Sequence, residues 1–173
     1  GQTPRRLVYC LPMRVLVRQT RSAIQDWVHG CEDYFTDRGQ NPPTVNLLMG
    51  ADQELGWSER PEDPAVIVGT QDMLLSRALM RGYGMTRYMW PAHYALLHND
   101  AFWVFDEIQL MGPAVETSAQ LEGFRRELGT AARSYSMWMS ATIESGGLDT
   151  IDHPRPEGGW DRLELSSEDH ARA

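Results

Sequence analysis

Short apolar runs alternate with longer stretches of helical spacing along the first 143 residues. The apolar runs predict five buried strands, at residues 7–11 (LVYCL), 44–49 (TVNLLM), 65–68 (AVIV), 101–105 (AFWVF) and 134–140 (SYSMWMS). Strands that are apolar on both faces and alternate with helices favour an α/β fold, with a mostly parallel sheet flanked by helices on both faces. In such sheets, ligands bind beyond the carboxyl ends of the strands.

Three helices are predicted between these strands. One follows Pro12, a second is capped by Thr70, and a third begins beside Pro113, where a first helical turn tolerates proline. The side chains expected to face the core are Leu16, Thr20, Ala23, Ile24 and Trp27 in the first helix, Met73, Leu74, Ala78 and Leu79 in the second, and Leu121, Phe124 and Leu128 in the third.

The alternating pattern ends after Ile143. Residues 144–173 are rich in glycine, proline and acids, which is typical of a linker. We therefore expect one domain over residues 1–143 and an acidic linker over 144–173. His153 and His170 each follow an aspartate in this stretch, and we interpret both as surface histidines rather than metal ligands.

Length and composition fit one domain with a real hydrophobic core, since the chain has 173 residues. No apolar run approaches the ~18 residues of a membrane span, and no signal-peptide layout opens the chain, so a cytoplasmic location is expected. The two cysteines, Cys10 and Cys31, have no CxxC spacing, which disfavours a zinc site or a disulfide scaffold. Because the chain opens on Gly1, we expect it to be a piece of a longer protein.

Arginines are unevenly distributed in this acidic chain. The net charge of −8 argues against nucleic-acid binding by the whole surface, and all sixteen basic residues are arginine, with no lysine. Two segments are locally basic. They contain Arg5, Arg6, Arg14, Arg18 and Arg21, and then Arg77, Arg81 and Arg87. These segments form either a phosphate-contacting face or scattered solvated arginines.

The stretch FWVFDEIQLMG delivers two adjacent acids, Asp106 and Glu107, to the end of a predicted strand. Such a pair is either an ordinary acidic strand end or part of a nucleotide site. In the latter case the aspartate holds Mg²⁺ and the second acid activates a water. Small and hydroxyl residues at other strand ends, in LPMRVLVRQT (11–20), GTQD (69–72) and SAT (140–142), favour the nucleotide site.

In this order, the motifs resemble the first RecA-like domain of a superfamily-2 helicase. LPMRVLVRQT resembles motif Ia, GTQDMLLSRAL the later nucleic-acid-contacting motif, DEIQ the DExx box and SAT motif III. The longer LLHNDAFWVFDEIQLMGP is similar to the CRISPR-associated helicase–nuclease of type I systems, as are Gln109 and the Leu-Met-Gly after it. The resemblance covers residues 5 to 143.

For catalysis, the resemblance implies an ATP-binding hydrolase of antiviral defence that translocates on and unwinds target DNA, with a nuclease on the same polypeptide. Asp106 would bind Mg²⁺–ATP, holding the metal from its second shell, and Glu107 would act on the attacking water. Gln109 would link the nucleotide to motif III, and Ser140 and Thr142 would couple hydrolysis to domain movement.

For binding, the resemblance implies single-stranded DNA and a CRISPR RNA-guided surveillance complex as partners. The residues expected along the DNA backbone are Pro12, Arg14, Gln19, Gly69, Thr70 and Gln71. The two arginine-rich segments fall on these two DNA-side motifs.

A chain without lysine cannot contain a phosphate-binding P-loop, whose lysine reaches the β/γ-phosphates. The P-loop strand, which neighbours the motif III strand in RecA-like sheets, is therefore expected outside this chain, as is a second RecA-like domain with its arginine finger. The sheet would then be incomplete, with an apolar edge that favours self-association. We predict that the isolated chain hydrolyses no ATP beyond background.

Two other interpretations stay open. The chain could be a catalytically silent RecA-like module that binds DNA or a protein. It could also be a fragment of another superfamily-2 enzyme, such as a repair or RNA helicase, although Gln109 and the residues after it disfavour that.

Overall fold

The computed structural model describes residues 3–142 and 146–163, and its centre is a six-stranded sheet in the order β3-β2-β4-β1-β5-β6. The strands are β1 (Arg6–Leu11), β2 (Thr44–Met49), β3 (Asp52–Gln53), β4 (Ala65–Thr70), β5 (Ala101–Phe105) and β6 (Tyr135–Trp138). Every neighbouring pair is parallel except β2 and β3. The five predicted strands and the mostly parallel sheet are confirmed, and β3 was not predicted.

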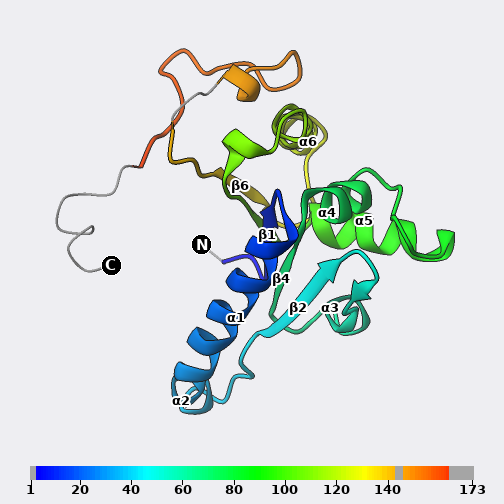
Figure 1. Ribbon diagram of the computed structural model, residues 1–173, viewed down its shortest axis with the longest axis vertical. Coiled ribbons are helices and arrows are strands. Elements are labelled where there is room, and N and C mark those ends of the chain that lie inside the picture. Colours follow the sequence, from blue (N-terminus) through cyan, green and yellow to red (C-terminus); the bar gives the residue numbers. More distant parts are fainter. Residues whose placement is uncertain (1–2, 143–145, 164–173) are drawn as a thin grey trace.

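Helices cover both faces of the sheet, as predicted (Figure 1). They are α1 (Arg14–Gly30), α2 (Glu32–Thr36), α3 (Gly56–Glu59), α4 (Gln71–Ala78), α5 (Trp90–His98) and α6 (Ala114–Leu128), with single 3₁₀ turns η1 (Arg87–Met89), η2 (Ile108–Leu110) and η3 (Gly146–Leu148). Helix α1 packs on one face, while α3, α4, α5 and α6 pack on the other. None of the described helices is both long and apolar enough to cross a bilayer.

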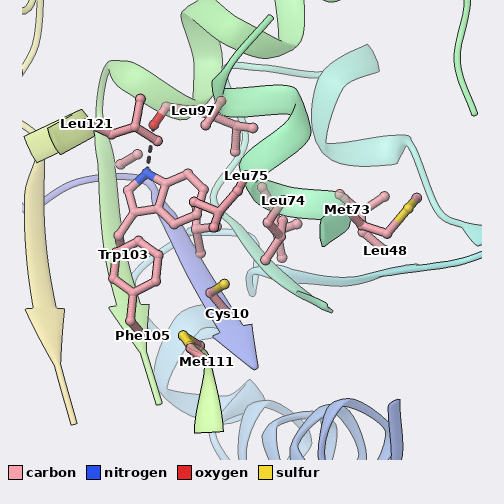
Figure 2. Packing of buried hydrophobic residues seen from close by; sticks show 14 of the residues in the cluster. Cys10, Leu48, Met73, Leu74, Leu75, Leu97, Trp103, Phe105, Met111 and Leu121 are labelled. Carbon is pink, nitrogen blue, oxygen red and sulfur yellow. Dashed lines mark hydrogen bonds between the residues drawn. The ribbon is translucent and has the colours of Figure 1, made fainter. Parts of the chain in front are cut away.

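The larger core lies between the sheet and helices α3 to α6 (Figure 2). Trp103 of β5 is fully buried and stacks on Phe105 with ring centroids 5.2 Å apart. Its indole Nε1–H donates to the carbonyl oxygen of Leu97 at 2.8 Å, so the polar end of this large side chain is satisfied at the end of α5.

All three of the predicted helix faces are partly wrong. In α1 the buried residues are Val17 and Ile24, whereas Trp27 is 70% exposed, because Val28 rather than Trp27 turns toward the sheet. In α6, Leu121 is buried but Phe124 and Leu128 are exposed. The side of α6 that packs inward carries small residues, including Ser118, Ala119 and Gly123. Likewise, Leu79 follows α4 and is exposed.

Two arginines of the basic segments are internal and serve the fold. Arg6 is buried and donates to the carbonyl oxygens of Pro61, Leu96 and Asn99 at 2.8 to 3.0 Å. Arg77 is buried and donates to Met73 and Gln53. Burial lowers the pKa of both guanidinium groups. Neither belongs to a phosphate-contacting surface.

Residues 146–160, here called the C-terminal segment, pack back on α6 and β6 instead of leaving the domain (Figure 1). Leu148 and His153 are buried, and the ring of His153 lies between Trp138 and Trp160, at centroid distances of 5.6 and 4.5 Å. The prediction of a surface histidine at 153 is therefore wrong, while His170 lies outside the described residues. A linker role for residues 144–173 stays a prediction.

Candidate functional site

The carboxyl ends of the parallel strands meet at one edge of the sheet and bring the predicted motifs together. The register pairs Leu11 of β1 with Thr70 of β4, and Phe105 of β5 with Trp138 of β6. Beyond these ends, the backbone N–H of Asp106 donates to the Cys10 carbonyl oxygen at 3.0 Å. Segments from four strands thus converge where α/β sheets place ligands.

Both carboxylate oxygens of Asp106 are held by protein donors. Oδ1 accepts the backbone N–H of Glu107 at 2.8 Å, and Oδ2 accepts the hydroxyl of Tyr9 at 2.9 Å. Burial and the bond to Asp106 raise the pKa of Tyr9 well above its usual range, so this hydroxyl stays a donor. The carboxylate of Asp106 is half-buried and oriented before any ligand binds.

Glu107 has left-handed backbone geometry, with φ 56° and ψ 43°. A non-glycine residue in this region costs on the order of 1–3 kcal/mol, and such residues cluster at functional sites. The neighbouring backbone holds the conformation, because the N–H of Ile108 donates to the carbonyl oxygen of Met139 at 3.1 Å. The strained turn therefore fixes the DExx-box acid against the strand end that carries SAT.

A chain of hydrogen bonds joins the acid to the SAT segment. The side-chain amide of Gln109 donates to Glu107 Oε2, and the hydroxyl of Ser140 donates to Gln109 Oε1 at 2.7 Å. The backbone N–H of Thr142 donates to Ser140 Oγ at 3.2 Å. All four residues were singled out from the sequence, and the structure brings them together in one connected set.

Oxygen donors dominate this end of the sheet. Mg²⁺ is held through one or two carboxylates together with waters and substrate phosphates. The carboxylates of Asp106 and Glu107, half-buried and adjacent, fit that kind of binding. Within the described ranges, no group of three or more histidine, cysteine or acidic side chains forms a closed metal cage.

Four of the six predicted DNA-side residues line one groove of about 960 Å³ at this edge: Pro12, Arg14, Thr70 and Gln71. Arg14 reaches over Gly50, where a Cβ would lie 3.0 Å from the guanidinium. Met111 and Pro113, just after the DExx box, line the groove as well. The groove lining therefore includes residues that follow Asp106 and Glu107 closely in the sequence.

The other two DNA-side residues lie elsewhere. Gln19 is exposed on α1 but outside the groove. Gly69 is buried in β4, where a Cβ would lie 2.7 Å from the carbonyl oxygen of Leu48, so its lack of a side chain serves the close packing of β4 on β2. Thr70 begins α4 as predicted, yet its side chain makes no capping hydrogen bond.

Sequence reasoning missed Tyr9 and Tyr83. A tyrosine near the end of an apolar strand is a weak signal for Tyr9, because only the pairing of β1 with β5 brings its hydroxyl to Asp106. Tyr83 lines the groove from the loop after α4, which no pattern in the sequence places there.

Comparison with known proteins shows the family of the chain. The family model for the DEAD/DEAH box helicase matches residues 1–150. The chain belongs to the DEAD/DEAH box helicase family. The Asp106–Gln109 turn described above has the sequence DEIQ, which resembles the DExx box. Helicases of this family use ATP and Mg²⁺ in general.

A solved structure supports the fold of this helicase domain. The crystal structure of the DUF1998 helicase MrfA bound to DNA matches with a TM-score of 0.53 and 18% sequence identity, covering 81% of this chain. The chain spans 18% of the length of that protein. A search of curated proteins found no match.

Proposed function

We propose that this chain is part of a DNA helicase of CRISPR interference. In that helicase it would position the water that attacks ATP, and it would bind one strand of the target DNA. One observation carries the proposal. The hydrogen-bonded set from Glu107 through Gln109 to Ser140 lies at the same sheet edge as the groove lined by Arg14 and Gln71.

On the nucleotide side, Asp106 would hold Mg²⁺ from its second shell, through a bound water. Tyr9 and the backbone N–H of Glu107 orient the carboxylate for this task. Glu107 would orient or deprotonate the attacking water. The side-chain amide of Gln109 donates to the Glu107 carboxylate and so holds it in position. Bound Mg²⁺–ATP supplies the reacting phosphoryl group, with the metal neutralising charge on its oxygens.

Coupling to movement would pass through Gln109. Its side-chain amide contacts Glu107 on one side and Ser140 on the other, so loss of the γ-phosphate beside Glu107 would alter a contact with the SAT segment. Ser140 and Thr142 follow directly after β6, which stands at the edge of the described sheet. We infer that a second RecA-like domain is moved through this segment.

The chain would need partners to complete the ATP site. It has no lysine for the phosphates, so the P-loop would come from a segment beyond this sequence, and the arginine finger from the second RecA-like domain. The free edge of β6 is where the P-loop strand of a RecA-like sheet would pair. A nuclease domain on the same polypeptide and an RNA-guided surveillance complex would be further partners.

On the DNA side, Pro12, Arg14, Thr70 and Gln71 would follow the sugar-phosphate backbone of single-stranded DNA along the groove. Arg14 is exposed and gives the groove a positive group for phosphate. The CRISPR assignment rests on the resemblance of LLHNDAFWVFDEIQLMGP.

The test is ATP-driven unwinding by the full-length polypeptide that carries this chain. The substrate is a labelled duplex with a single-stranded tail, free or held open by a CRISPR RNA-guided complex. We expect unwinding and degradation that require ATP and are strongest on the guided complex. Equal unwinding of both substrates would instead identify another superfamily-2 helicase. DNA binding that ATP never affects would identify a silent module.

A further inference from the structure

The loop of residues 79–89, between α4 and α5, exposes an unusual number of large apolar side chains. Leu79, Met80, Tyr83 and Tyr88 are all at least 44% exposed. Tyr83 stands out because it is 70% exposed and also lines the groove that contains Arg14 and Gln71. An aromatic ring left in solvent at the mouth of a groove is typical of a binding position, since tyrosine supplies large contact area with few rotatable bonds.

The loop that carries Tyr83 is fixed by its backbone. The N–H groups of Arg81 and Gly82 donate to the carbonyl oxygen of Ser76 at 2.8 and 3.1 Å, and the N–H of Tyr83 donates to Ser76 Oγ at 3.3 Å. Gly82 lies against Trp90 so closely that a Cβ would meet its ring Cδ1 at 2.6 Å. The ring of Tyr83 is therefore presented by a rigid turn, which lowers the entropy cost of binding.

The charges beside this ring include two arginines, while one acid, Asp72, also lines the groove. Arg14 lines the groove, and Arg81 precedes Tyr83 by two residues. In the described part of the chain, neither arginine forms an ion pair with a carboxylate. The exposed ring of Pro113 also lines the groove, whereas Met111, which lines it too, is only 2% exposed. The groove thus offers both phosphate contacts and flat apolar surface.

We propose that Tyr83 stacks on a nucleobase of the single-stranded DNA held in the groove, while Arg14 contacts the backbone. The inference rests on the proposed function, because it takes the same strand as ligand and adds how its bases are held. Base–aromatic stacking contributes about 1–3 kcal/mol per base and tolerates any sequence, because every base has a flat face. Such a contact suits a motor that must move along arbitrary sequence.

The experiment compares two fluorescent 20-mers, oligo-dT and the same backbone with abasic sites throughout, binding to the full-length polypeptide that carries this chain, in fluorescence anisotropy. Tyr83→Ala removes the ring, and Tyr83→Phe keeps the ring without the hydroxyl. Tyr88→Ala is the matched control, since Tyr88 is 95% exposed in the same loop but does not line the groove. Arg14→Ala tests the backbone contact on which the proposed function depends. Circular dichroism confirms that each variant is folded.

We expect Tyr83→Ala to weaken oligo-dT binding about tenfold, the equivalent of ~1.4 kcal/mol. Its affinity for the abasic strand, and the binding of Tyr83→Phe and Tyr88→Ala to both strands, should stay within about twofold. Arg14→Ala should weaken both strands alike. Suppose that Arg14→Ala weakens the binding of both strands, while Tyr83→Ala changes the binding of neither strand or of both strands equally. The stacking proposal is then wrong, and the proposal that the groove binds DNA is retained. If the wild-type full-length polypeptide binds neither strand, both proposals fail.

Discussion

Gly123 of α6 is the position where one added methyl group should dislodge the C-terminal segment. A Cβ on Gly123 would lie 2.6 Å from the carbonyl carbon of Asp152 and 3.3 Å from the backbone nitrogen of His153. These are backbone atoms, which cannot rotate away as a flexible side chain can. Gly123→Ala therefore requires either α6 or the segment of residues 146–160 to move.

The size of the effect follows from what the segment buries. Leu148 is 8% exposed, and burying a leucine contributes about 1.5–3 kcal/mol. The hydrogen bond between His153 Nδ1 and the Leu148 carbonyl oxygen, at 2.9 Å, adds about 1 kcal/mol. Alanine gains about 1 kcal/mol over glycine within a helix. The net loss should be about 2 kcal/mol, a fall in Tm of about 4–8 °C for a domain of this size.

Thermal unfolding by circular dichroism measures the loss, and chymotryptic cleavage after Leu148, which is buried in the wild type, reports release of the segment. Trp138 and Trp160, which flank His153, should shift their fluorescence to longer wavelength. Gly158→Ala is the matched control, because a Cβ there meets nothing within 4 Å. A Gly123→Ala protein that melts no lower than wild type and resists chymotrypsin equally would refute the packing argument.

Three further predictions concern Tyr9, His93 and the isolated chain. Tyr9→Phe should lower the free energy of unfolding by about 1 kcal/mol at neutral pH, measured in urea. Because the pKa of Tyr9 is raised in the folded state, the stability of the wild type should also fall above pH ~10, where the tyrosine of the unfolded chain ionises. The Tyr9→Phe protein should lose less stability in that pH range. An equal fall in both proteins would contradict this expectation. Burial, together with the charge of Arg77, lowers the pKa of His93 to about 4, so stability should fall as pH drops from ~6.5 toward 4, by up to ~1.4 kcal/mol per unit. His93→Phe should flatten that slope, and an unchanged slope would refute the assignment. Finally, phosphate release by the isolated chain should not exceed background; turnover abolished by Glu107→Gln would overturn this.

The strands, and the edge of the sheet at which the predicted motifs lie, were predictable because both depend on local patterns. Apolar runs of four to seven residues located five strands, and parallel pairing then placed Asp106, Gln71 and Ser140 at one edge. The hydrogen bond from Gln109 to Glu107 required only that the turn after β5 be tight. The sequence was therefore sufficient to bring the motif segments to one edge of the sheet.

The remainder depended on contacts between distant residues. Helix α5 has no clear apolar face, since His93 and His98 are buried in it together with Leu97, so its periodicity was not visible. The buried position of His153 depends on Trp138, and that of Arg6 on three carbonyl groups of other segments. Charge patterns in the sequence could not reveal these partners.

DNA-stimulated ATP hydrolysis by the full-length polypeptide that carries this chain tests the central claim most directly. Glu107→Gln removes the carboxylate proposed to act on water while keeping the side-chain shape, and Glu116→Gln, an exposed acid on α6, serves as control. We expect Glu107→Gln to lower the turnover rate by about 10²–10⁴ and to leave the affinity for single-stranded DNA unchanged. A Glu107→Gln protein that hydrolyses ATP within twofold of the wild-type rate would contradict it.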